Sequence, residues 1–218
     1  MIHQARAEST RRTILGAAVE VLDEVGYSNA SLTEVIDRAG VTKGAFYYHF
    51  PTKAAMAAAI VADCDLLIEG AARAVRDSSS TATALENLVR TAFVVADRAG
   101  IDKTIRVGIQ LTDALGDAAE HVRSERHRAV LVAVVEKAIS EGDVRTDVNA
   151  EDLGHALWVA LVGNHLLSEA AGQNLIASQA RVLRILLAGV CTDRSAPFFD
   201  RFVDRLAGHY EVAAAGQH

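Results

Sequence analysis

Residues that interrupt helices are scarce in this chain, and their scarcity limits its possible folds more than any other feature. Only two of its 218 residues are proline, the residue that removes a backbone donor and breaks a helical hydrogen-bond ladder. Half of the residues are hydrophobic, and they recur at spacings of three and four, as on one face of a helix. We therefore predict an all-α protein.

Glycines and short polar turns divide the chain into about ten predicted helices. Gly26 is expected to end the first one, since glycine readily adopts the left-handed conformation that follows a helix. Ser31 and Glu34 fit a capping box at the start of the second helix, and Thr42 and Thr52 can cap the third and fourth. The segments run over about 7–25, 33–39, 43–49, 53–76, 82–99, 102–114, 118–141, 150–171, 173–190 and 197–213.

Several classes of protein are excluded at this level. The first residues lack the apolar segment of a signal peptide, and no apolar run approaches the ~18 residues of a membrane span. Cys64 and Cys191 are isolated, so they form neither a disulfide framework nor a metal cluster, and His121 and His127 lack the spacing of metal ligands. We expect a cytoplasmic protein that uses no cofactor, no metal and no membrane.

Net charge does not exclude a nucleic-acid partner. The chain carries a formal charge of −6, but residues 1–53 contain six basic and six acidic side chains and are neutral. The acidic excess belongs to the rest of the chain. The basic groups of the first part can therefore still form a local positive surface.

Two short helical segments (33–39 and 43–49), separated by the turn Gly40-Val41 and the cap residue Thr42, have the size of a helix-turn-helix. In that motif the second helix enters the major groove of DNA with its N-terminal residues nearest the bases. Thr42 and Lys43 stand at this helix start, where free N–H groups and the helix dipole favour a phosphate. Gly44 has no side chain and lets DNA come close.

Three polar rings follow in the same segment, and they are stiff enough to hold a contact with DNA. They belong to Tyr47, Tyr48 and His49. Phe46 and Phe50, four residues apart, share a face and should instead pack against the first two helices. Lys53 begins the next helix and can hold a second phosphate.

The segment from Gly40 to Lys53 reads Gly-Val-Thr-Lys-Gly-x-Phe-Tyr-x-His-Phe-x-Thr-Lys, and it resembles the DNA-binding signature of the TetR family. This resemblance covers residues 10–60 densely. It implies phosphate contacts from Thr33, Thr42, Tyr47, His49 and Lys53, and base or groove contacts from Lys43, Gly44 and Tyr48. Together with the helix pattern, it predicts a DNA-binding domain over 1–53 and a ligand-binding and dimerisation domain over 54–218.

Within that family the chain resembles the γ-butyrolactone receptor branch of Streptomyces and relatives. The similarity lies in residues 4–18, 40–45, 106–111 and 142–144. Members of this branch control antibiotic synthesis by leaving DNA when a small lactone or furan signal binds. The chain departs from them at His127, where the receptors carry a tryptophan that lines the pocket. That departure allows a more polar or antibiotic-like ligand.

The second domain should hold a mostly apolar pocket with a few polar groups that orient a ligand. Candidates for its lining are Phe93, Ile105, Ile109, Gln110, His127, Val130, Leu131, Val134, Trp158 and Val162. Each of them also fits an ordinary place in the core. Gln110 and His127 are the polar exceptions.

Two apolar stripes near the end of the chain predict a dimer interface of the four-helix kind that TetR-like proteins form. The stripes run from Leu153 to Leu167 and from Val182 to Val190, and the residues expected at the interface are Leu153, Leu157, Leu161, Asn164, Val182, Leu183, Leu186 and Leu187. A dimer would pair two DNA readers about one helical turn apart. The alternative is that the stripes cover only the core of their own protomer.

The expected function is that of a repressor that is not an enzyme. It would bind a palindromic operator as a homodimer and be released by a small hydrophobic effector, such as a γ-butyrolactone-type signal, that shifts the fourth helix. The alternatives are an architectural DNA-binding protein without a ligand, or a regulator of efflux or lipid genes with an unrelated hydrophobic ligand. An enzyme would need a nucleophile with its base, a metal motif or a phosphate-binding glycine loop, and we find none in the sequence.

Overall fold

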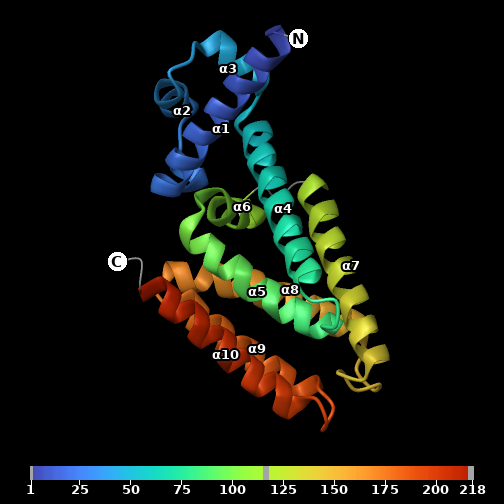
Figure 1. Ribbon diagram of the computed structural model, residues 1–218. Coiled ribbons are helices and arrows are strands. Elements are labelled where there is room, and N and C mark those ends of the chain that lie inside the picture. Colours follow the sequence, from blue (N-terminus) through green and yellow to red (C-terminus); the bar gives the residue numbers. More distant parts are fainter. Residues whose placement is uncertain (1, 115–117, 216–218) are drawn as a thin grey trace. The chain divides into compact units, whose positions relative to one another are not determined.

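The computed structural model describes residues 2–114 and 118–215, which form ten helices (Figure 1). Their bounds are α1 Ile2–Asn29, α2 Leu32–Ala39, α3 Lys43–His49, α4 Lys53–Ser78, α5 Ala84–Ile101, α6 Lys103–Ala114, α7 Ala118–Glu141, α8 Ala150–Ala170, α9 Leu175–Val190 and α10 Ala196–Ala215. The only β-type pairing in these residues is an isolated bridge between Val144 and Cys191. The all-α prediction is confirmed. None of the helices in the described parts combines the length and hydropathy that crossing a bilayer demands.

The predicted caps of α2 to α4 agree with the structure, but the predicted end of α1 does not. Gly26 interrupts α1 with a φ of 75° and a ψ of 164°, but the helix continues to Asn29 and does not end at this glycine as predicted. The side-chain oxygens of Ser31, Thr42 and Thr52 each accept a hydrogen bond from the backbone N–H three residues later, at 3.0 to 3.2 Å. These three caps are therefore confirmed, although α1 begins earlier than predicted, at Ile2.

The described residues pack as two compact units, and we describe each by itself. The first unit takes its described residues from Met1–Leu67 and Ala99–Asp117, and the second from Ile68–Arg98 and Ala118–His218. The boundary passes through α4 and α5, so that α6 belongs with α1 to α3. These are units of packing, and the functional division predicted after residue 53 stays a prediction.

The first unit has an apolar core to which α1, α2, α3, the start of α4 and α6 contribute. Phe46 and Phe50 both lie in it, with ring centroids 6.1 Å apart, which confirms that these two rings pack inward. Val107 and Leu111 of α6 are buried in the same cluster. The short α3 is thus held in place by its own aromatic residues.

Helix α6 is joined to α4 by close packing and to α1 by charge. A Cβ atom on Gly108 would lie 2.3 Å from the Cβ of Cys64, so the two helices approach where a larger residue does not fit. Arg106 donates from Nε and Nη2 to the two carboxylate oxygens of Asp23 at 2.8 and 2.9 Å. The first unit therefore includes α6 as a structural part.

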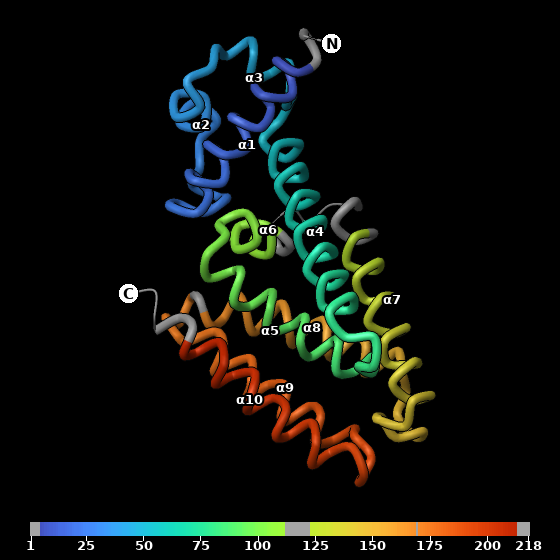
Figure 2. Tube along the Cα trace, in the orientation of Figure 1, coloured from blue at the N-terminus to red at the C-terminus, as the bar shows by residue number. Residues whose placement is uncertain are grey.

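The second unit contains α7 to α10 together with most of α5 and the end of α4 (Figure 2). In it α7 packs on α8, α8 on α9 and α9 on α10. Phe93, Leu157, Leu183 and Phe199 are among the fully buried side chains of its core. This core lies between the helices that the sequence predicted for ligand binding and for dimerisation.

Candidate nucleic-acid interface and effector site

The turn between α2 and α3 is fixed by its own backbone. Gly40 adopts a left-handed φ of 63°, and its N–H donates to the carbonyl of Asp37 at 3.1 Å. The N–H of Val41 donates to the carbonyl of Ile36 at 3.3 Å. Because a side chain at position 40 would strain this conformation, the turn holds α3 in the defined relation to α2 that a helix-turn-helix requires.

The start of α3 presents polar groups to the outside of the first unit. Thr42, Lys43 and Gly44 are all exposed. The Thr42 hydroxyl accepts the N–H of Ala45, which leaves its own hydrogen free to be donated outward. A Cβ on Gly44 would meet nothing within 4 Å, so an approaching surface can reach the backbone there.

The polar rings of α3 are also accessible. Tyr48 is 80% exposed, Tyr47 is exposed and His49 is half-buried. The ring of Tyr47 stands edge-on to the buried ring of Phe46, with centroids 5.5 Å apart, so the core orients it. Thr33 on α2 is exposed as well, and the structure thus brings these predicted contact residues to the surface of one helix pair.

Lys53 is engaged inside the first unit in a way that the sequence did not indicate. Its Nζ donates to the carbonyl of Tyr27 and lies 4.5 Å from the centroid of the Tyr27 ring. An ammonium group has three donors, so one of them ties the start of α4 to the end of α1. A phosphate contact from Lys53 stays a prediction.

Cations in the first unit fall into two groups. Arg38, Lys103 and Arg106 are paired with Glu24, Glu20 and Asp23 at 2.5 to 2.8 Å. In contrast, Arg6, Arg11, Arg12, Lys43 and Lys53 form no ion pair within residues 2–114 and 118–215. The positive charge that no carboxylate compensates therefore lies on α3, on the first half of α1 and at the start of α4.

The paired carboxylates have altered pKa values. The hydrogen-bonded guanidinium of Arg106 holds the pKa of Asp23 below its usual value. Arg38 lowers the pKa of Glu24 in the same way. These acidic groups on the second half of α1 are ionised at neutral pH and offer no attraction to a phosphate.

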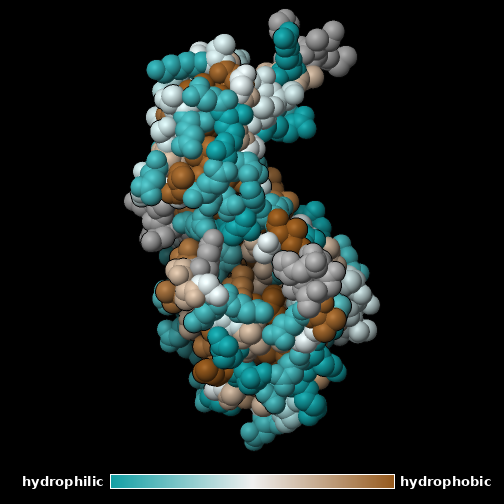
Figure 3. Space-filling view, turned by 90° about the vertical axis from the view of Figure 1, so that its left-hand side faces the viewer, coloured by the Kyte–Doolittle hydropathy of each residue, from teal (hydrophilic) through white to brown (hydrophobic). Residues whose placement is uncertain are grey.

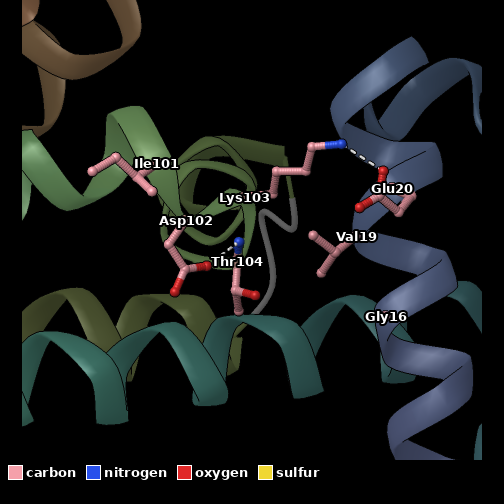
Figure 4. A pocket seen from close by; sticks show the side chains of 7 residues that line it. All are labelled: Gly16, Val19, Glu20, Ile101, Asp102, Lys103 and Thr104. Atoms are coloured by element: carbon pink, nitrogen blue, oxygen red, sulfur yellow. Dashed lines mark hydrogen bonds and ion pairs between the residues drawn. The ribbon is translucent and has the colours of Figure 1, made fainter. Parts of the chain in front are cut away.

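An open recess of about 490 Å³ lies between α1 and the start of α6, within the first unit (Figure 4). Its lining residues are Gly16, Val19, Glu20, Ile101, Asp102, Lys103 and Thr104. Lys103 reaches across it to Glu20 at 2.5 Å, and Asp102 accepts the N–H of Thr104 at 2.8 Å. The recess shares no residue with the predicted effector pocket, and its polar groups already bind one another.

Part of the predicted effector site assembles in the second unit. The ring of His127 on α7 stacks on that of Trp158 on α8, with centroids 5.0 Å apart and planes 3° from parallel. Leu131 is buried and Val134 and Val162 are partly buried on the same two helices. Val130 is 57% exposed, while Phe93 lies in the core against Tyr210, with centroids 6.1 Å apart.

The other predicted pocket residues belong to the first unit. Ile105, Ile109 and Gln110 all lie on α6. Ile105 is fully buried, and its carbonyl accepts from the thiol of Cys64 at 3.6 Å. Their role in ligand binding stays a prediction.

The predicted dimer stripes are mostly covered by their own chain. Leu153, Leu157, Leu183 and Leu187 are buried in the core of the second unit, and the partly buried Leu161 and Leu186 pack against it. Val182 is partly buried as well. The apolar side chains that α8 and α9 do expose are Val159, Leu167 and Ile185, at 53, 71 and 75%. Hydrophobic spacing found the helices but did not distinguish their two apolar faces.

A buried polar cluster joins α8 to α9. Asn164 donates from Nδ2 to Oε1 of Gln179 at 3.0 Å, and its Oδ1 accepts from the Ser178 hydroxyl at 2.5 Å. Asn164 was predicted at the dimer interface, but only 7% of it is exposed. Its visible role is to set how α8 and α9 pack within one protomer.

Comparison with known proteins agrees with the helix-turn-helix. Residues 14–60 match the family described as bacterial regulatory proteins, tetR family. A γ-butyrolactone receptor described as ArpA-like superposes with a TM-score of 0.78 at 27% identity, over 94% of this chain and 99% of that one.

Residues 14–60 are therefore similar to the tetR family of bacterial regulatory proteins, and the fold of the chain is similar to that of a γ-butyrolactone receptor.

Two further relatives refine this placement. The A-factor receptor protein of Streptomyces griseus is 51% identical over 61 residues, which is 28% of this chain but only 22% of that protein. CprB of Streptomyces coelicolor, solved in complex with its biological operator sequence, has a TM-score of 0.71 at 28% identity and covers 94% of this chain. These similarities agree with the prediction of a tetR-like transcriptional regulator that is not an enzyme.

Proposed function

We propose that this chain is a tetR-family repressor that binds a palindromic operator as a homodimer and leaves it when a small effector binds. The start of α3 carries the proposal. There Thr42, Lys43 and Gly44 are exposed on a helix whose other face is anchored in the core by Phe46 and Phe50. A rigid helix with an open polar start is what major-groove docking needs.

The proposed contacts divide by role. Lys43 reads a base edge, because a cation at the helix start faces the acceptors of guanine. Thr42, Tyr47 and His49 bind phosphates, which position the helix but carry no sequence information. Thr33 contributes a further phosphate contact from α2, and Tyr48 reaches the groove wall.

The proposed dimer forms through α8 and α9. Two readers must lie about one DNA turn apart to bind successive major grooves. The exposed Val159, Leu167 and Ile185 support this pairing, since large apolar side chains exposed on adjacent helices favour burial against a partner. The buried leucines of the same helices would support that surface from below.

The proposed effector binds near the stacked rings of His127 and Trp158. Flat aromatic faces suit a lactone or furan ring, and the fold similarity to a γ-butyrolactone receptor over 94% of the chain favours that ligand class. The imidazole favours a second candidate, a more polar or antibiotic-like ligand that hydrogen-bonds to His127. In either case the effector must prefer the state that does not fit DNA, and a coupling of ~1–3 kcal/mol changes affinity about 5- to 150-fold.

A gel-shift experiment with the DNA upstream of the chain's own gene tests this function. Wild type should bind, and the double variant Lys43→Ala, Tyr47→Ala should bind more than about tenfold more weakly, because each protomer loses one base and one phosphate contact. Lys137→Ala, which removes an exposed charge from α7, is the matched control. Equal affinity of the double variant and wild type at moderate salt would exclude α3 as the reader.

The effector half of the proposal needs a separate measurement. A synthetic γ-butyrolactone, or a culture extract for the second candidate, should release wild type from the same DNA. Trp158→Ala should keep DNA binding and lose the release. If no small molecule changes DNA affinity while the protein stays folded and dimeric, the chain is a ligand-independent DNA-binding protein instead.

A further inference from the structure

The first half of α1 carries Arg11, a charged side chain that forms no ion pair in the described residues and contacts an aromatic ring instead. The guanidinium carbon of Arg11 lies 5.6 Å from the centroid of the Phe50 ring, which is a cation–π distance. Phe50 directly follows α3, and its N–H donates to the carbonyl of Phe46 at 2.9 Å. Because Phe50 is buried, its ring is held in place and positions Arg11 beside the end of α3.

The charge of Arg11 is not compensated by a carboxylate. It forms no ion pair in the described parts of the chain, although Glu8 lies one helical turn before it. A cation–π contact is not a hydrogen bond to an oxygen acceptor, so N–H donors of the guanidinium remain available for one. Arg11 is thus held in position and still able to donate several hydrogen bonds.

The engagement of Lys53 with Tyr27 adds to this argument. The sequence predicted that Lys53 binds a phosphate, but its ammonium group already donates one hydrogen bond to the Tyr27 carbonyl. We propose that Arg11 binds a DNA phosphate, so that the backbone interface extends from α3 onto α1. This proposal rests on the proposed DNA binding. A guanidinium fork matches phosphate oxygens geometrically, and one already held by a ring loses less freedom on binding.

The salt dependence of duplex binding tests this contact. Each phosphate that a protein neutralises adds about 0.9 to the slope of log affinity against log salt. Arg11→Ala should therefore lower the slope by about 0.9 per protomer, both on the upstream DNA and on a mixed-sequence duplex. Arg11→Lys should restore the slope without the full affinity. Arg76→Ala, which removes the same charge from an exposed position on α4, should keep the wild-type slope.

The outcomes separate this contact from the function on which it rests. A folded Arg11→Ala protein that keeps the wild-type slope overturns the contact alone, as does an equal loss of slope in Arg76→Ala. Arg11→Gln, which retains the alkyl chain, repeats the test if the alanine variant melts early. A wild-type chain that binds neither duplex overturns both the function and the contact.

Discussion

At the scale of single residues, Gly108 lets α6 approach α4 closely because it has no side chain. Its position would place a Cβ atom 2.3 Å from Cys64, and overpacking of this kind costs ~1–3 kcal/mol. We expect Gly108→Ala to lower the free energy of unfolding by about that amount, measured by urea denaturation.

A second glycine provides the control for this variant. Gly70 lies inside α4 with nothing within 4 Å of its would-be Cβ, so Gly70→Ala should stabilise the protein by up to ~1 kcal/mol through helix propensity. If Gly108→Ala were as stable as Gly70→Ala, the close approach of α4 and α6 would not limit this position.

Lys53 shows that local sequence does not predict a contact with a residue far away in the chain. Its place at a helix start predicted a phosphate contact, and its place in the fold adds a bond to Tyr27. The two residues are 26 positions apart, so no helical spacing relates them. Caps such as Thr42 were predictable because donor and acceptor lie three residues apart.

At the scale of elements, the pair Asp23–Arg106 links α1 to α6 and makes their association depend on pH. Arg106 lowers the pKa of Asp23 in the folded protein. A carboxyl of this kind stabilises the fold above its unfolded pKa, and the contribution disappears as pH falls through the folded value. Stability should therefore decline below about pH 4, the ordinary value for aspartate.

Urea midpoints measured across pH check this expectation. Asp23→Asn should be less stable at pH 7 and should show a shallower decline in acid, because it has no charge to lose. Asp37→Asn, an exposed acid of the same unit, should follow the wild-type curve. Parallel acid declines in wild type and Asp23→Asn would contradict the role of this pair.

Helices α8 and α9 show that a hydrophobic pattern predicts a helix but not which of its apolar residues are buried. Their spacing predicted two apolar stripes, and both helices exist close to the predicted bounds. The leucines chosen for the interface are largely buried in the protomer, whereas Leu167 and Ile185 are exposed. When a helix has apolar residues on two faces, the sequence spacing does not tell which face is buried within the protomer. Only the packing of the folded chain distinguishes the two faces.

At the scale of the whole molecule, the proposed dimer depends on the exposed residues of α8 and α9. The double variant Leu167→Asp, Ile185→Asp should be monomeric in light scattering after size exclusion, because it would bury two charges in the interface. Ile101→Asp, at an exposed apolar residue of the first unit, should remain a dimer. A double variant that stays dimeric would place the interface elsewhere.

The sequence by itself determined the helices, their caps and the polar start of α3, because these depend on residues within one or two turns of each other. The tertiary structure alone decided that α6 packs with α1 and α4, that Lys53 binds Tyr27, that Arg11 lies on Phe50 and which leucines of α8 and α9 are buried. Each of these contacts joins residues far apart in the chain. Helical periodicity gives the direction of a side chain around its own axis, but it carries no information about which other helix lies there.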